Sequence, residues 1–339
     1  MLRLLVLFCF IEMGVTTMTA QGRTRRPMTE FTTDTAMVHD PVMAYEDGVY
    51  YMFSTGMGIQ LMTSSDRRSW TFKPGGVMGH DGIPAWTHDS VPGFRNHVWA
   101  PDIFRFNNRW WIAYSCSTFG RNTSAIGLIS SPTLATPQWT DEGCVITSRQ
   151  DRNNWNAIDA NICADADGRP WMTFGSFWDG IQIIPLDSTM HAVGSPRTIA
   201  RRWGDNLSHG GNPTSEYAGE NAIEAPFIFH KDGWYYLFVS WDYCCRGEKS
   251  TYRVAVGRSR KITGPYLDRN GKDMSTGGGT PFFGGDGVSL QAAGHCAAYS
   301  FPDGDIFICH GYSVAHDGAA MLVQRKISWT DDGWPTVEP

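Results

Sequence analysis

The residues of this sequence that could do chemistry recur at one place in a repeated motif. Each stands nine positions before a turn of the Asp-Gly or Asn-Asn kind. The set comprises His39 with its neighbour Asp40, Trp99, Asp159, Glu224 and His295. Cleavage of a glycosidic bond uses one protonated carboxylic acid for the leaving oxygen and one ionised carboxylate that activates water or attacks the sugar. A third carboxylate nearby can raise the pKa of the acid and keep it protonated.

Two alternatives compete with such a carboxylate pair. A single acid at the start of a strand is often a surface turn residue, but three acids at one repeat position favour a shared site. Metal-assisted hydrolysis would use compact ligand patterns such as H-E-x-x-H, which the sequence lacks. The acids therefore point to hydrolysis by paired carboxylates.

The elements that must position these residues are repeated hairpins. In each repeat an apolar segment leads into a turn, and an aromatic segment follows the turn. The apolar segments with their turns cover residues 39–48, 99–108, 159–168, 224–233 and 295–304. Asp-Gly and Asn-Asn between apolar runs are strong hairpin signals. Five such units, about 60 residues apart, predict an all-β, single-domain, five-bladed β-propeller. A β-sandwich is the alternative, but it gives no reason for a five-fold repeat. In a propeller, the repeated positions would converge at the central axis.

The composition agrees with this class of protein. The chain has 339 residues, 37 Gly, 13% aromatic and only 18% charged residues, with a net charge of −6. High apolar and aromatic content excludes a disordered chain or a coiled coil. The absence of a basic excess argues against nucleic acid as a partner.

The N-terminus predicts export. A basic start, an apolar run and a small-residue cleavage site predict a signal peptide over residues 1–20, followed by an N-terminal segment 21–35 and the propeller domain 36–339. The apolar run is too short for a membrane anchor, so we expect a secreted or periplasmic protein with no membrane attachment after removal of the signal. Seven cysteines then remain, with no C-x-x-C pair.

Several short motifs occur in a fixed order along the chain. They are His39-Asp40-Pro41, Trp99-Ala-Pro-Asp102, Asn156-Ala-Ile-Asp159, Ala222-Ile-Glu224-Ala-Pro226, Cys244-Cys245-Arg-Gly247, Ile262-Thr-Gly-Pro-Tyr266 and Gly294-His295. On these motifs, residues 36–335 resemble glycoside hydrolase family 43, and within it the endo-α-1,5-L-arabinanases. The resemblance implies a five-bladed propeller that hydrolyses arabinan with inversion at the anomeric carbon.

The resemblance also implies roles for particular residues. Asp40 would be the general base, Glu224 the general acid, and Asp159 the residue that tunes the acid and holds substrate. His295 would face a calcium ion in the central channel, either structural or supporting; no organic cofactor is expected. The residues expected at the substrate are Trp99, Phe119, Asn156, Ser176, Phe177 and Trp178.

Several functional alternatives stay open at this stage. The expected partner is plant cell-wall arabinan or an arabino-oligosaccharide, cleaved internally by a monomer. Exo-acting arabinanase, arabinofuranosidase and β-xylosidase activities share the fold and the three acids, and a non-catalytic carbohydrate-binding propeller is an alternative of another class. The stretch 201–221, a long loop before Glu224, could set endo against exo cleavage.

Overall fold

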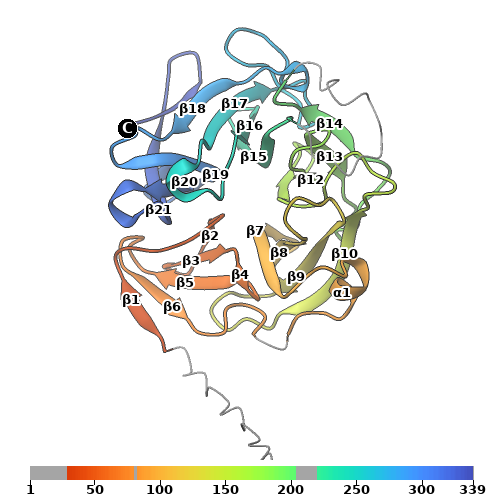
Figure 1. The fold of residues 1–339 in the computed structure, drawn as a ribbon, viewed down its shortest axis with the longest axis vertical. Helices are drawn as coiled ribbons and strands as arrows, with labels where there is room; N and C mark the ends of the chain where they lie inside the picture. Colours follow the sequence, from red (N-terminus) through yellow and green to blue (C-terminus); the bar gives the residue numbers. More distant parts are fainter. Residues whose placement is uncertain (1–28, 80–81, 204–219, 339) are drawn as a thin grey trace, which may run out of the picture.

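The computed structural model describes residues 29–79, 82–203 and 220–338. Five antiparallel sheets surround a central axis like the blades of a propeller (Figure 1). The predicted all-β, five-bladed fold is therefore confirmed. The predicted signal peptide lies outside the described residues. Among the described residues, no helix has the length and apolar character needed to cross a bilayer.

Each blade is led by one of the predicted hairpins. The first blade contains β2 (Val42–Glu46), β3 (Val49–Ser54), β5 (Gln60–Ser64) and β6 (Trp70–Lys73), with β1 (Phe31–Thr33) on its outer edge. The second contains β7 (His97–Phe106), β8 (Arg109–Cys116), β9 (Ser124–Ser131) and β10 (Thr140–Ser148), with β4 (Gly56–Met57) beside β7. The third contains β11 (Asn161–Ala164), β12 (Pro170–Phe174), β13 (Ile181–Pro185) and β14 (Arg197–Ala200).

The last two blades repeat the same order of strands. The fourth contains β15 (Ile223–Lys231), β16 (Trp234–Trp241), β17 (Arg253–Ser259) and β18 (Thr280–Gly284). The fifth contains β19 (Leu290–Phe301), β20 (Gly304–Ser313), β21 (Ala319–Trp329) and β22 (Pro335–Val337). The helices are short: α1 (Trp86–Ser90), η2 (Gly247–Lys249), η3 (Met274–Thr276) and η4 (Val314–His316).

The turns explain why the hairpins form where the sequence predicts them. Asp47 and Gly48 join β2 to β3, and both have positive φ, 51° and 85°. Asn107 and Asn108 do the same between β7 and β8, at 49° and 58°. Two-residue turns with positive φ at both positions match the twist of antiparallel strands, and Asn, Asp and Gly adopt them at least cost.

The ring closes through the chain before the first blade. The backbone N–H of Val38 donates to the carbonyl of Ala320 at 3.1 Å, and that of Leu322 to the carbonyl of Ala36 at 2.9 Å. Residues 36–38 therefore lie beside β21 of the last blade, while β1 joins the first blade by pairing with β6. The first blade thus reaches back to Phe31, before the boundary predicted at residue 36.

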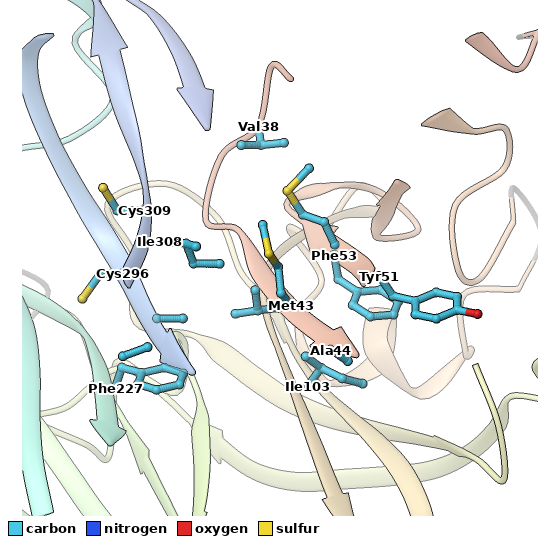
Figure 2. Close-up of a cluster of buried hydrophobic side chains, with 14 of the residues drawn as sticks. Val38, Met43, Ala44, Tyr51, Phe53, Ile103, Phe227, Cys296, Ile308 and Cys309 are labelled. Carbon is cyan, nitrogen blue, oxygen red and sulfur yellow. The ribbon is translucent and has the colours of Figure 1, made fainter. Parts of the chain in front are cut away.

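The apolar core lies between neighbouring blades. Figure 2 shows Val38, Met43 and Phe53, from the first blade and the segment before it, in the same cluster as Ile308 and Cys309 of β20. All these side chains are at most 4% exposed. Burial of apolar surface between the sheets stabilises the ring and holds the inner strand of each blade near the axis.

Candidate active site

Each blade has a residue with left-handed backbone in its inner strand or shortly before it. These residues are Asp40, Ala100, Asp159, Ala225 and His295, with φ of 58°, 33°, 59°, 53° and 50°. Non-glycine residues rarely adopt this conformation, and it persists where the surrounding structure enforces it. Equivalent positions in all five blades therefore share one local geometry, as the repeat predicts, although in three blades they lie one residue after the predicted position.

Hydrogen bonds between blades hold this geometry in place. Four of these residues donate a backbone N–H to a side chain from the second strand, or its end, in the preceding blade. The pairs are Ala100 to Thr55 Oγ1 at 2.8 Å, Asp159 to Ser115 Oγ at 3.0 Å, His295 to Ser240 Oγ at 2.8 Å and Asp40 to His310 Nδ1 at 3.1 Å. At the fifth position the N–H of Ala225 donates to Asp159 Oδ2 at 3.3 Å.

Asp40 is buried among cationic and hydroxyl partners. Its Oδ1 lies 2.8 Å from His39 Nδ1 and 3.0 Å from His295 Nδ1, and its Oδ2 accepts a 2.6 Å hydrogen bond from Thr55. Burial by itself would raise the pKa of Asp40, but His295 and His39 outweigh it and hold this pKa well below its usual range. Asp40 is therefore an ionised carboxylate.

The neighbouring histidines divide into charged and neutral rings. Burial would lower the pKa of His39, yet Asp40 raises it well above its usual value. His310 is driven the other way by its burial and by the charge of His39. Its Nδ1 accepts the Asp40 N–H, so its proton is on Nε2. His310 therefore supports the backbone of Asp40 as a neutral ring.

Glu224 is buried between two hydroxyl groups. Its Oε2 accepts a 2.7 Å hydrogen bond from Ser176, and its Oε1 accepts one of 2.7 Å from Tyr252. Burial raises the pKa of Glu224 despite both hydrogen bonds, which favour the ionised form. Glu224 therefore holds a proton more readily than Asp40 does.

Asp159 and His295 interact electrostatically with both Asp40 and Glu224. Burial, opposed by His295 and reinforced by Glu224 and Asp40, raises the pKa of Asp159 well above its usual value. Burial would lower the pKa of His295, but Asp40, Asp159 and Glu224 together raise it to about 9. One imidazolium therefore interacts with all three carboxyl groups that the sequence analysis singled out.

The residues predicted to contact substrate are placed at different depths. Phe119 is 80% exposed in the loop after β8. Trp99 is half-buried at the start of β7, where its indole N–H donates to His97 Nδ1 at 3.2 Å. Phe177 is half-buried, with its ring centroid 5.9 Å from that of Tyr243. These three side chains expose surface, and their contact with substrate stays a prediction.

The other three predicted substrate residues lie deeper. Ser176 is buried and bonded to Glu224, so in this structure it holds the acid. Asn156 is buried, and its Oδ1 accepts a 2.7 Å hydrogen bond from Ser124. Trp178 is 4% exposed. Asn156 and Trp178 expose little surface, and their contact with substrate stays a prediction.

The side chains near the axis do not form a calcium cage. Among the described residues, His39, Asp40 and His310 bring potential ligand atoms within 4.8 Å of one another. Two imidazoles and one carboxylate suit a transition metal better than calcium, which takes about six to eight oxygen ligands. His295 directs Nδ1 at Asp40 Oδ1, 3.0 Å away, so this nitrogen is engaged by the carboxylate. The residues present therefore do not fit the expected calcium ion.

Sequence reasoning missed residues that hold the acids. Thr55 and Tyr252 donate to Asp40 and Glu224, and His310 accepts from the Asp40 backbone. A signal for some of them exists in the repeat. Thr55, Ser115, Ser240 and His310 each stand 15 positions after one of the left-handed residues of their own blade.

The chain resembles known proteins along most of its length. The model of a family described as "Glycosyl hydrolases family 43" matches residues 34–335. An extracellular exo-alpha-(1->5)-L-arabinofuranosidase, ArbA of Cellvibrio japonicus, is 41% identical over 308 residues, 89% of this chain and 86% of the relative. An extracellular endo-alpha-(1->5)-L-arabinanase 1 of Bacillus subtilis is 40% identical over 306 residues, 88% and 87% of the two chains.

A solved structure extends the similarity to three dimensions. The crystal structure of an exo-1,5-alpha-L-arabinanase from a bovine ruminal metagenomic library is 50% identical. It superposes with a TM-score of 0.82 and covers 90% of this chain and 98% of its own. Sequence and fold therefore agree on one family.

Proposed function

This chain belongs to glycosyl hydrolase family 43, and on that ground we propose that it hydrolyses α-1,5-linked arabinan with inversion. The family match and relatives named for this linkage support the substrate. The observation that carries the reaction is the opposite electrostatic bias on two carboxyl groups: Asp40 is held ionised, while Glu224 is biased toward its protonated form. Acid and base roles follow from environments that separate two pKa values in this way.

In the proposed reaction, Asp40 removes a proton from water, which attacks the anomeric carbon from the face opposite the leaving group. Glu224 gives its proton to the glycosidic oxygen as that bond breaks. Inversion requires separate acid and base groups with room for water between them. At the end of the cycle Asp40 carries a proton and Glu224 has lost one, so proton exchange with solvent restores both groups.

Asp159 and His295 take supporting roles in this proposal. Asp159 and Glu224 disfavour each other's negative charge, since burial and Glu224 raise the pKa of Asp159; this repulsion is how Asp159 would tune the acid, and it also accepts the N–H of Ala225 next to that acid. His295 provides the positive charge that keeps Asp40 ionised. Trp99 and Phe119, both with exposed ring surface, are proposed as apolar walls for the sugar.

The mode of cleavage has two candidates. Internal cleavage is the mode predicted from the sequence, and the endo-arabinanase relative at 40% identity supports it. Release from chain ends is the second candidate, favoured by the exo-arabinanase structure at 50% identity.

Product analysis on debranched arabinan over time separates the two modes. Internal cleavage yields a ladder of oligosaccharides and an early fall in viscosity, whereas exo cleavage yields one short product from the start. Arabinoxylan serves as the control substrate for β-xylosidase and arabinofuranosidase activity. Binding of arabinan without any new reducing ends would instead identify a carbohydrate-binding propeller and contradict the proposal.

We also propose that the protein is exported as a monomer. Two relatives are named extracellular, and the predicted signal peptide at residues 1–20 supports the same location. N-terminal sequencing of protein from culture medium tests the cleavage site, and light scattering tests the monomer.

A further inference from the structure

A pair of adjacent cysteines lies in the loop that joins β16 to β17, beside the catalytic carboxylates. Among the seven cysteines that the structure describes, none is in a disulfide and only Cys245 is exposed. Its neighbour Cys244 is half-buried. The Cys245 Sγ atom lies 3.7 Å from His39 Nε2, and His39 in turn bonds Asp40. No step of the hydrolysis proposed above uses these thiols.

We propose that Cys244 and Cys245 form a redox-responsive modification site, which a peroxide closes into a disulfide and a thiol reductant reopens. The two residues are adjacent in sequence, and Cys244, together with His39 and against the effect of burial, lowers the pKa of the Cys245 thiol to about 5. Because Cys245 is exposed, an oxidant can reach its thiol. Cys244 would supply the second sulfur of the disulfide. A reactive exposed cysteine next to a resolving cysteine is the usual arrangement of a redox-responsive pair.

The chemistry balances in two steps. The Cys245 sulfur attacks one oxygen of hydrogen peroxide, the O–O bond breaks, and Cys245 sulfenic acid and water are formed. The Cys244 sulfur then attacks the Cys245 sulfur, which forms the S–S bond and releases a second water. Two thiols lose two hydrogen atoms in total, and the peroxide is reduced to two waters.

Closure of the disulfide would disturb the general base through a short chain of contacts. The N–H of Cys245 donates to Tyr312 Oη at 2.6 Å. The same oxygen lies 3.1 Å from His39 Nε2 and 3.3 Å from His310 Nε2. Consecutive Cα atoms are about 3.8 Å apart, closer than the roughly 4.4–6.8 Å of a usual disulfide, so closure requires the backbone at Cys245 to move, and Tyr312 is bonded to that backbone. The expected result is a fall in kcat/KM of about tenfold or more, since displacements near 1 Å can cost about 10²-fold.

Mass spectrometry of the full-length protein tests the disulfide directly. Trypsin cleavage after Lys231 and Arg246 leaves both cysteines on one peptide, residues 232–246. After peroxide treatment and alkylation of free thiols, we expect this peptide to be unalkylated and two hydrogens lighter. Dithiothreitol should restore alkylation at both positions. A peptide that stays doubly alkylated after peroxide would overturn the proposal.

Matched variants separate this pair from the other thiols. Cys244→Ser should form no disulfide and should accumulate a sulfenic acid at Cys245 that dimedone traps. Cys144→Ser, on β10 away from the axis, should keep both the disulfide and the loss of activity. The buried residues Cys296 and Cys309 should remain alkylatable only after unfolding.

The activity measurement completes the test. Peroxide should lower kcat/KM on arabinan in the unmodified protein, and dithiothreitol should restore it. A disulfide that forms with unchanged kcat/KM would refute the regulatory part. This part rests on the proposed function, whereas the peptide masses do not, so failure of the glycosidase assignment and failure of the redox pair are distinguishable.

Discussion

The Nδ1 atom of His295 lies 3.0 Å from Oδ1 of Asp40 and joins the last blade of the propeller to the first. Both residues have left-handed backbone, at φ of 50° and 58°; His295 lies within β19, and Asp40 lies two residues before β2. The contact places a positive charge at the proposed general base and exists only because the ring closes. Burial would raise the pKa of Asp40 and lower that of His295, and this contact opposes both effects.

Substitution of His295 should shift the pH dependence of activity upward. His295 lowers the pKa of Asp40, and also opposes the raised pKa of Asp159 and Glu224. In His295→Gln the pKa of the base rises, so the acidic limb of kcat/KM moves to higher pH. The pKa of the acid rises too, so the basic limb moves in the same direction. His191→Gln, on an exposed residue, is the control. An acidic limb that stays in place would contradict this account.

Replacement of the general acid should depend on the leaving group. Glu224→Gln cannot protonate the glycosidic oxygen, so we expect a loss of about 10²–10⁴-fold in kcat/KM on arabinan. In aryl arabinosides, an acidic phenol can leave without receiving a proton. The loss of kcat/KM on these substrates should therefore be much smaller. Steady-state kinetics on both substrates measure the difference, and the exposed Glu338→Gln serves as control. Equal losses on both substrates would show that Glu224 is not the acid.

Removal of the Tyr252 hydroxyl should make the general acid weaker. Its hydrogen bond to Glu224 Oε1 favours the ionised carboxylate, so in Tyr252→Phe the pKa of Glu224 rises. The acid then stays protonated to higher pH, and the basic limb of kcat moves up. Tyr266→Phe, a buried tyrosine in the same blade whose hydroxyl bonds Ile262, is the matched control. A basic limb that moves down would reverse the assignment of this hydrogen bond.

Loss of an inter-blade hydrogen bond should destabilise the ring. Ser115→Ala leaves the N–H of Asp159 without its acceptor in a buried position. An unsatisfied buried donor costs about 1–3 kcal/mol of unfolding free energy. Urea unfolding measures this change, and Ser65→Ala in an exposed turn should stay within about 0.5 kcal/mol of the unmodified protein. A change at Ser115 as small as that at Ser65 would mean that water replaces the hydroxyl.

Local signals explain why the blades could be predicted. The Asp47-Gly48 and Asn107-Asn108 turns are each set by two neighbouring residues. Strands such as β12 (Pro170–Phe174) match the aromatic segment of their repeat. Because the repeat places equivalent residues at the axis, Asp40, Asp159 and Glu224 could also be proposed as neighbours. Both steps need only short-range chemistry and the periodicity of the chain.

Other features depend on contacts between distant parts of the chain. Residues 36–38 close the ring on β21, and Tyr252, the residue before β17, bonds Glu224 from the end of the loop after β16. His310, 270 residues from Asp40, supports that residue through its ring nitrogen. No local pattern encodes which side chain reaches a carboxylate across a blade boundary.

The sequence by itself determined the class of fold and the three acids, since turn preferences and apolar alternation act within a few residues. Only the tertiary structure decided their charge states, since these depend on burial and on His39 and His295 within about 3 Å of Asp40. It also placed His295 Nδ1 3.0 Å from Asp40 Oδ1, a contact that the order of residues does not reveal. Electrostatic energy depends on distance in space, which the order of residues does not contain.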